Sequence, residues 1–364
     1  MDAAQHVLFA AGAGGYHTYR IPALVVSGTG ALLAFCEGRR FSARDAGQID
    51  LLLRRSVDGG GAFLPPQVIA SEPGWTCGNP APVVDRQTGV IWLLFSKNAQ
   101  DATEALIWQG QASRTVWVTH SDNEGMSWSP PIEITATVKP ETWSWYATGP
   151  GHGIQLRSGR LLVACDHGAL QERNRQDPYH SHVVYSDDHG DTWTVGGSVD
   201  EGTNESTAVE TTDGWLSINC RNKHALADGR NFRAVAWSCD GGETFSPIVH
   251  DAALPEPICQ ASVYRYPGAL PSGASLTLFT NPAATDPMCG GRNHLTLRLS
   301  YDECRTWPVA HVLWAGPAAY SDLSSTPDGA IYCLYENGNA LPYERITLTR
   351  LELNELAATG SQPG

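Results

Sequence analysis

The sequence contains five copies of one short pattern, Ser-x-Asp-x-Gly-x-x-aromatic. The copies are SVDGGGAF (56–63), SDNEGMSW (121–128), SDDHGDTW (186–193), SCDGGETF (238–245) and SYDECRTW (300–307). Their starts lie 65, 65, 52 and 62 residues apart. Asn123 replaces Asp in the second copy and Cys304 replaces Gly in the fifth, and neither change alters the spacing. Self-similarity at such a period indicates a repeat architecture.

Each copy is typical of a tight hairpin turn. Strand-like runs rich in β-branched and aromatic residues lead into it, such as HVVYS (182–186), RAVAWS (233–238) and LTLRLS (295–300). We expect the Asp carboxylate to accept hydrogen bonds from nearby backbone N–H groups and the Gly to take a positive φ. The closing aromatic side chain should pack back under the turn. The recurring positions of the repeat are therefore expected to be structural and not catalytic.

Short strands, repeated turns and a unit of about 60 residues predict an all-β, six-bladed β-propeller of four-stranded antiparallel blades. The sixth blade would combine AIYCLYENG (330–338) and RITLTRLEL (345–353) with a strand from the amino terminus, which hides the sheet edges. No shift in composition marks a linker, so we expect residues 1–364 to form one domain. About the last ten residues should form a disordered tail, and a helical period is visible only in 351–360.

The charge balance excludes some partners. The chain has 24 Lys and Arg against 38 Asp and Glu, a formal charge of −14, which argues against binding to nucleic acid or to anionic membranes. No apolar run reaches the roughly 18 residues of a transmembrane segment. The amino-terminal segment is a poor signal peptide. We expect a cytoplasmic location, or a secreted or periplasmic one if a signal peptide has been removed.

The nine cysteines are odd in number, scattered, and contain no CxxC pair. This usage favours buried free thiols over a disulfide framework or a metal site.

Three arginines stand where packing alone would favour other residues. Arg20 lies inside the strand-like run TYRIPALVV, Arg221 ends SINCRN (217–222), and Arg292 lies in CGGRNHL (289–295). A lone arginine in a strand is commonly a surface residue whose stem covers apolar neighbours. The inner strands of a propeller gather at its axis, so these three could instead converge on one anion, since a carboxylate pairs well with arginine.

Two acidic residues and one tyrosine complete the set of candidates. Asp45 lies in SARDAGQID (42–50), Glu205 in TNESTAVE (203–210) and Tyr320 in AAYSDLSS (318–325). By residue type alone, a loop carboxylate is usually solvated and such a tyrosine is usually an ordinary half-buried side chain.

These stretches together resemble the exo-α-sialidase (neuraminidase) superfamily, which joins bacterial enzymes with animal cytosolic ones. The resemblance runs from about residue 16 to 353. It is carried by the five repeats in series and by YRIPAL, CEGRR (36–40), RDAGQIDLLLRRS (44–56), TGPGHGIQL (148–156), NESTAVE, GRNHLTLRLSYD, AYSDL and LYENG.

The resemblance implies roles for ten residues. The arginine triad that grips the carboxylate of sialic acid corresponds to Arg20, Arg221 and Arg292. The catalytic residues correspond to Asp45 as the acid/base, Tyr320 as the nucleophile and Glu205 as the glutamate that activates it. The remaining site residues correspond to Glu336 of LYENG, which orients the first arginine, and to Glu37, Arg39 and Asn79 of GNPAP (78–82), which line the site.

The implied function is that of a retaining glycoside hydrolase, a neuraminidase of carbohydrate metabolism. It would hydrolyse terminal α-ketosidically linked sialic acids from glycoproteins, gangliosides or oligosaccharides, without a metal or an organic cofactor. Two variants of this activity stay open: a preference for the deaminated sugar KDN, and transfer to another sugar. A different class, a non-catalytic sialic acid-binding propeller or a scaffold, has no need of an acid and a nucleophile.

Two segments, 96–108 and 166–177, are expected to form specificity loops. Asn204 starts the only Asn-x-Ser/Thr sequon, directly before Glu205, and we expect it to carry no glycan.

Overall fold

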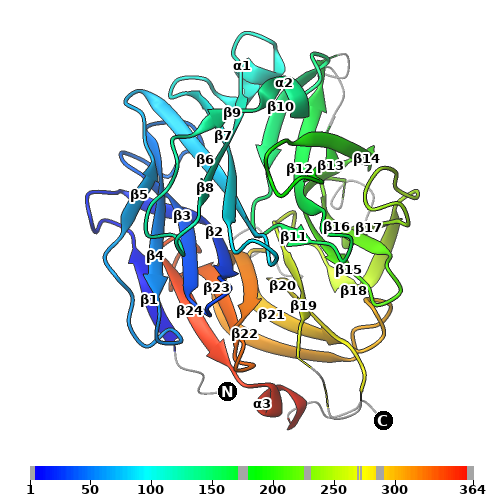
Figure 1. Cartoon of the computed structure of the whole chain (residues 1–364). Coiled ribbons are helices and arrows are strands. Elements are labelled where there is room, and N and C mark those ends of the chain that lie inside the picture. Colours follow the sequence, from blue (N-terminus) through cyan, green and yellow to red (C-terminus); the bar gives the residue numbers. More distant parts are fainter. Residues whose placement is uncertain are drawn as a thin grey trace.

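The computed structural model describes residues 5–170, 179–224, 231–268, 270, 273–283 and 291–358. This part of the chain is almost entirely antiparallel β-sheet, which confirms the all-β prediction. It has three short helices: α1 (Glu104–Trp108), α2 (Thr135–Val138) and α3 (Leu353–Ala358). Figure 1 shows the strands following one another around the middle of the molecule in sequence order, so that the blue strands lie beside the red ones. None of the described helices is long and apolar enough to cross a membrane.

The first sheet joins two groups of four strands. The first group consists of β2 (Thr18–Val26), β3 (Leu32–Arg39), β4 (Ile49–Ser56) and β5 (Gln67–Ala70). The second consists of β6 (Trp75–Val84), β7 (Ile91–Ala99), β8 (Thr115–Ser121) and β9 (Ile132–Glu133). A single parallel pair, Ile49 with Thr76, connects β4 to β6. The sequence did not predict this connection.

The next two sheets are smaller. One contains β10 (Trp143–Thr148), β11 (Ile154–Gln155), β12 (Leu161–Ala169), β13 (Tyr179–Ser186) and β14 (Thr194–Glu201). The other contains β15 (Thr203–Glu210), β16 (Leu216–Asn222), β17 (Phe232–Ser238) and β18 (Val249–Pro255). Within them, the predicted strands 182–186 and 233–238 are confirmed.

The fourth sheet contains both the first and the last strand. Its members are β19 (Ser262–Tyr266), β20 (Leu276–Pro282), β21 (Asn293–Ser300), β22 (Val309–Ser325), β23 (Ile331–Asn337), β24 (Arg345–Leu351) and β1 (Gln5–Ala10). The long strand β22 pairs with β21 through its first half and with β23 through its second. The antiparallel pairing of β1 with β24 confirms that an amino-terminal strand completes this sheet. Helix α3 occupies the start of the expected tail, whose remainder, 359–364, lies outside the described residues.

The five repeat turns share one geometry. The Ser Oγ of each turn accepts a hydrogen bond of 2.8–3.0 Å from the backbone N–H four residues later. The Asp or Asn side chain accepts a similar bond. Asn123 preserves the turn because its amide oxygen accepts the same bond as a carboxylate. Cys304 has φ +65°, so it adopts the left-handed conformation that Gly provides in the other four turns. The turn prediction is therefore confirmed, both substitutions included.

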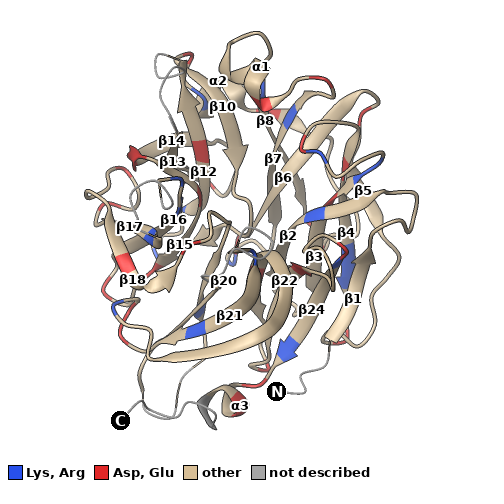
Figure 2. Cartoon of the chain, turned by 180° about the vertical axis from the view of Figure 1, so that it is seen from behind, with Lys and Arg blue, Asp and Glu red and all other residues tan. Residues whose placement is uncertain are grey.

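The repeat aromatics pack into the core, as predicted. Trp193 is buried, Trp128 contacts Phe35 edge-on with ring centres 5.7 Å apart, and Trp307 packs on Phe279 at 5.6 Å. Eight described cysteines are free thiols, six of them buried, and Cys289 lies outside the described residues. Figure 2 shows acidic and basic residues interspersed over strands and loops in the reverse view.

A cluster of histidines is buried between β12 and β13. His167 and His182 face each other with their Nδ1 atoms 3.1 Å apart, and Trp143 stacks on His167 with a ring-centre separation of 3.4 Å. Burial first, and then a neighbouring histidine, lowers the pKa of both rings: His182 is that neighbour for His167, and His180 is that neighbour for His182, whose pKa falls to about 3. Both rings are therefore neutral at pH 7, and one Nδ1–H donates to the other Nδ1.

This cluster predicts a loss of stability in acid. Below the unfolded-state pKa of about 6.5 the unfolded chain binds protons that the folded chain excludes, so the free energy of unfolding falls as pH falls from about 6.5 towards 3. Each ring contributes a slope of about 1.4 kcal/mol per pH unit. Urea unfolding of the wild type and of His182→Asn between pH 7.5 and 4.5 measures this slope. Equal slopes for the two proteins would contradict the prediction.

Candidate active site

Four of the strands that carry predicted site residues are interrupted by β-bulges at or next to those residues. The strand register shifts between Arg20 and Ala23 in β2, between Gly78 and Ala81 in β6, between Thr203 and Ser206 in β15, and between Ala318 and Ser321 in β22. A bulge bends its strand and re-aims a side chain. Each bulge also leaves a backbone N–H without its sheet partner, and a buried polar group must then accept it.

The bulge in β2 sets the direction of Arg20. Ile21 has φ +60°, a conformation that a β-branched residue adopts at a cost of about 1–3 kcal/mol, and Pro22 fixes the next φ. Arg20 is only 6% exposed, and its Nε donates to Glu336 Oε1 at 2.7 Å. The alternative of an exposed, surface Arg20 is therefore wrong.

Glu336 connects Arg20 to the backbone of Tyr320. Its Oε1 also accepts the N–H of Ile21 at 2.8 Å, and its Oε2 accepts the N–H of Tyr320 at 3.1 Å. Glu336 is fully buried. One carboxylate thus satisfies the free N–H groups of two bulges and holds the guanidinium between them.

Tyr320, Glu205 and Arg221 form a second connected group. The Tyr320 hydroxyl donates to Glu205 Oε1, while Arg221 Nη1 donates to Glu205 Oε2 at 2.6 Å and to the Tyr320 hydroxyl at 3.1 Å. β15 and β16 are antiparallel neighbours, which brings Glu205, near the start of one, beside Arg221, near the end of the other. Tyr320 is therefore not an ordinary half-buried tyrosine: it is 5% exposed and hydrogen-bonded to a carboxylate.

The surroundings of Tyr320 have opposing effects on its acidity. Burial, and then the charge of Glu205, raises the pKa of Tyr320 well above its ordinary value, whereas Arg221 and Arg292 lower it. The phenol is therefore protonated in the free protein, with the Glu205 carboxylate as hydrogen-bond acceptor and the Arg221 cation already beside its oxygen.

Arg292 completes the group of three arginines. Its Nη1 donates to the Tyr343 hydroxyl and its Nη2 to the Ile258 carbonyl, both at 2.9 Å. Its guanidinium carbon lies 5.7 Å from the centre of the Tyr320 ring, and that of Arg20 lies 5.1 Å from the same centre. The three predicted arginines are thus brought together around one tyrosine.

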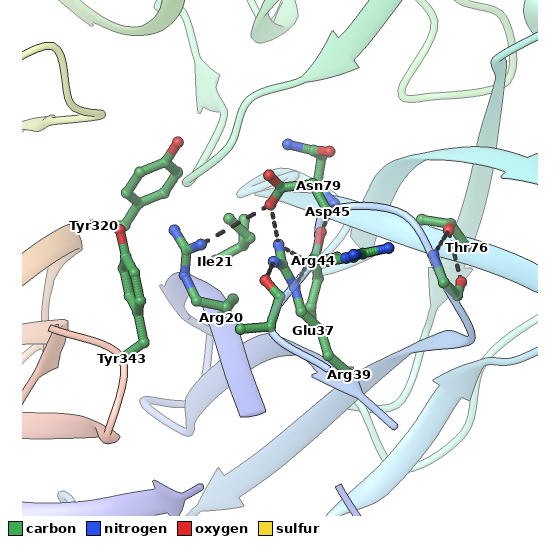
Figure 3. A network of polar contacts seen from close by, with 12 residues as sticks. Arg20, Ile21, Glu37, Arg39, Arg44, Asp45, Thr76, Asn79, Tyr320 and Tyr343 are labelled. Atoms are coloured by element: carbon green, nitrogen blue, oxygen red, sulfur yellow. Dashed lines mark hydrogen bonds and ion pairs between the residues drawn. The ribbon is translucent and has the colours of Figure 1, made fainter. Parts of the chain in front are cut away.

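Asp45 lies on the other side of Arg20, in the loop between β3 and β4. Its side chain is 82% exposed, and its Oδ1 lies 2.8 Å from Arg39 Nη2 and 4.0 Å from Arg20 Nη1. Partial desolvation raises the pKa of Asp45, but the charges of Arg39 and then Arg20 outweigh it and lower the pKa below its usual value. Figure 3 shows Asp45 between these two arginines, across Arg20 from Tyr320. Asp45 is therefore ionised in the free protein.

Glu37, in β3, accepts the free N–H of the bulge in β6, as Glu336, in β23, does for the bulge in β2. Its Oε1 accepts the N–H of Asn79, which has φ +58°, at 2.8 Å, and its Oε2 accepts both Nε and Nη2 of Arg39. Glu37 and Arg39 are buried, whereas Asn79 is partly exposed. All three thus lie in one network with Asp45.

A chain of polar contacts that was not predicted from the sequence continues from Asn79 towards Asn204. Arg114 donates to Asn79 Oδ1 at 2.6 Å and stacks over the ring of Trp145, whose Nε1 donates to Asp166 Oδ2 at 2.9 Å. Asn204 Nδ2 donates to the same oxygen at 3.0 Å. Burial, and then Glu205, raises the pKa of Asp166 well above its ordinary value. A charged residue inside the apolar run LLVACDHGA was a signal of the same kind as Arg20.

Asn204 is 6% exposed and uses its side-chain amide in this chain of contacts. A glycan on that nitrogen would have to displace the contact with Asp166, which supports the expectation that the sequon is unoccupied. Of the two expected specificity loops, 96–108 comprises the end of β7, a turn and helix α1. Residues 166–169 of the other are the end of strand β12, and 171–177 lie outside the described residues.

A cavity of about 1000 Å³ lies away from this site. Leu24–Val26, Val209, Glu210, Ser324 and Ser325 are part of its lining, and these are the last residues of β2, β15 and β22. Arg20, Glu205 and Tyr320 precede them in the same three strands. None of the ten predicted site residues lines the cavity.

Comparison with known proteins first places the chain among proteins with BNR-like repeats. A family model described as a BNR repeat-like domain matches residues 30–333. The chain is 35% identical to a sialidase of Micromonospora viridifaciens over 355 residues, which is 93% of this chain and 52% of that protein, so it spans about half of that relative. It is 32% identical to an exo-alpha-sialidase of Aspergillus fumigatus, covering 89% of this chain and 79% of that protein.

Mouse Sialidase-3 is 31% identical and covered to 90% on both sides. Among solved structures, Hadza microbial sialidase Hz136 superimposes with a TM-score of 0.85 at 29% identity, covering 97% of this chain and 69% of that one. The intramolecular trans-sialidase of Ruminococcus gnavus has a TM-score of 0.80 at 19% identity and 99% coverage of both chains, which shows the shared fold. The chain belongs to the exo-α-sialidase superfamily.

Proposed function

We propose that this protein is a retaining exo-α-sialidase, a glycoside hydrolase that releases terminal α-linked sialic acid from glycoconjugates through a tyrosine nucleophile. The observation that carries the proposal is the hydrogen bond from Tyr320 to Glu205, framed by three arginines. The sialidase relatives named above support the choice of substrate.

We also propose that the four sheets form a six-bladed propeller. Dividing the first sheet at its single β4–β6 contact, and the fourth within β22, leaves six groups of four-stranded character in sequence order. The first strands of four different groups (β2, β6, β15 and the second half of β22) then carry Arg20, Asn79, Glu205 and Tyr320. These would be the inner strands of four blades and would bring residues far apart in sequence to one axis.

The arginines suit the substrate's carboxylate. Arg20, Arg221 and Arg292 present guanidinium groups in a desolvated site, where an anion gains most from them. Glu336 fixes the first of these groups.

A tyrosine suits the anomeric carbon, which carries that carboxylate. A carboxylate nucleophile would be repelled there, whereas a phenol is neutral until it attacks, and sialidases are a known exception to the two-carboxylate rule. In the first step the Tyr320 oxygen bonds to the anomeric carbon and Glu205 takes the phenol proton. The bond to the glycan oxygen breaks, and Asp45 gives that oxygen a proton.

In the second step water attacks the anomeric carbon and gives its proton to Asp45, the bond from that carbon to the Tyr320 oxygen breaks, and Glu205 returns its proton to that oxygen. Two displacements on the same carbon retain its configuration. Asp45 is ionised in the free protein because Arg39 and Arg20 lower its pKa. A substrate carboxylate bound at Arg20 offsets one of these charges, so substrate binding shifts Asp45 towards the protonated form that the first step needs. Arg39 and Glu37 hold the Asp45 side of the site, and Asn79 forms part of the pocket beside it.

Hydrolysis of a fluorogenic α-sialoside, run beside the KDN equivalent, tests the proposal. We expect fluorophore release from the N-acetylated substrate and, by proton NMR, an α-anomer as the first product. Faster release from the KDN substrate would identify the KDN variant, and a transfer or anhydro product would identify a trans-sialidase. Binding without turnover would identify the non-catalytic class, and protein inert to both substrates would overturn the proposal.

A further inference from the structure

We propose that Tyr343 is a positioning residue of the carboxylate site, whose hydroxyl orients Arg292 and whose ring orients Arg20. This inference rests on the proposed function, in which these two arginines bind the substrate carboxylate. Tyr343 lies in the loop between β23 and β24, and no pattern in the sequence singled it out.

Tyr343 contacts both arginines at once. Its hydroxyl accepts a hydrogen bond of 2.9 Å from Arg292 Nη1, and its ring centre lies 4.0 Å from the guanidinium carbon of Arg20. A cation over an aromatic face at this distance is attracted by the negative face of the ring. Figure 3 shows Arg20 beside the rings of both Tyr320 and Tyr343. The Tyr343 ring therefore also confines the Arg20 side chain on the side away from Asp45.

The phenol of Tyr343 carries no charge, and this matters as much as its position. Arg20 is paired with Glu336 and Arg221 with Glu205, whereas the hydrogen-bond partners of Arg292 within the described residues are a phenol and the Ile258 carbonyl. A neutral acceptor holds a guanidinium in place without neutralising it. Arg292 is thereby oriented and yet keeps its full charge for an incoming anion.

The loop that carries Tyr343 is itself fixed by the next residue. The Glu344 carboxylate accepts hydrogen bonds of 2.9, 2.8 and 2.9 Å from the backbone N–H groups of Asn339, Ala340 and Leu341. Three backbone bonds to one carboxylate close the loop into a single conformation. Tyr343 is therefore presented to the arginines before any ligand arrives, and the arrangement is preorganised.

The variant Tyr343→Phe removes the hydroxyl and keeps the ring. Two ligands are compared by calorimetry: an unsaturated sialic acid analogue with a free carboxylate, and its methyl ester. We expect the affinity for the free acid to fall about tenfold, the scale of one hydrogen bond to a charged group, and that for the ester to fall less than twofold. In turnover, KM should rise more than kcat falls.

Tyr335→Phe is the matched control. Tyr335 is fully buried in β23 and its hydroxyl lies 3.1 Å from Thr349 Oγ1, so this variant loses a tyrosine hydroxyl outside the site and should bind both ligands like the wild type. Circular dichroism and thermal unfolding establish that each variant folds. A folded Tyr343→Phe that binds the free acid as tightly as the wild type overturns the inference, as does an equal loss for acid and ester. Wild-type protein that binds neither ligand overturns the proposed function instead.

Discussion

Replacing Tyr320 with phenylalanine is expected to abolish turnover and leave the affinity for a sialic acid-like inhibitor within about threefold of the wild type. The change removes only the hydroxyl that donates a hydrogen bond to Glu205 and accepts one from Arg221, and the ring stays between the arginines. Loss of an activated nucleophile lowers kcat by about 10³-fold or more. Steady-state hydrolysis of the fluorogenic sialoside gives kcat, and inhibitor titration gives the affinity.

Tyr264→Phe provides the control for this variant. Tyr264 bonds through its hydroxyl to Ser325 Oγ at 2.9 Å and lines the cavity at the far end of the inner strands, so its loss should not alter kcat. Retention of more than a tenth of the wild-type kcat by Tyr320→Phe would exclude Tyr320 as the nucleophile. Loss of inhibitor binding together with turnover would mean that the hydroxyl serves binding instead.

Replacing Arg292 with alanine is expected to weaken binding of the carboxylate-bearing inhibitor about 100-fold or more. Truncating one member of a desolvated, hydrogen-bonded charge pair costs about 2–5 kcal/mol. Because the described partners of Arg292 are neutral, its removal leaves no carboxylate uncompensated in the free protein, and the loss reports on the ligand itself. The inhibitor affinity of Arg292→Lys should lie between those of the wild type and Arg292→Ala, since an ammonium keeps the charge but cannot form a bidentate pair.

Arg157→Ala removes the same formal charge at a distance. The Arg157 side chain is 57% exposed and lines the far cavity, so this variant should bind the inhibitor like the wild type. An unchanged affinity for Arg292→Ala would remove it from the triad. An equal loss in both variants would show that the effect is general electrostatics and not a contact.

Much of the fold follows from local sequence. The repeat turns depend on interactions within five to eight consecutive residues, which explains why their hydrogen bonds, including those of the variant copies with Asn123 and Cys304, agree with expectation. The strands that lead into these turns are equally local. The parallel contact between β4 and β6 and the sharing of β22 by two strand groups are tertiary, and no residue pattern marks them.

The candidate site divides in the same way. Arg20 was detectable because a charged residue inside an apolar run must be paired if it is buried. Asp166 lies in such a run too but was not selected from the sequence. Tyr343 carried none, since a tyrosine in a loop is commonplace and its two arginine partners are distant in sequence. The bulges that aim Arg20 and Tyr320 were equally invisible, because they depend on which carboxylate accepts the freed N–H groups.

The pairing of Arg20 with Glu336, 316 residues later, has a consequence for the order of events during synthesis. At a ribosomal rate of about 5–20 residues per second, the carboxylate is made about 15–60 s after the arginine. Throughout that interval the Arg20 guanidinium lacks its buried partner at Nε, and the exposed Asp45 carboxylate, 4.0 Å from Nη1, is the anion already made. We therefore expect β2, among the first strands to emerge, to be among the last to lock into place, so a nascent chain gains this centre only after residue 336 has left the ribosome.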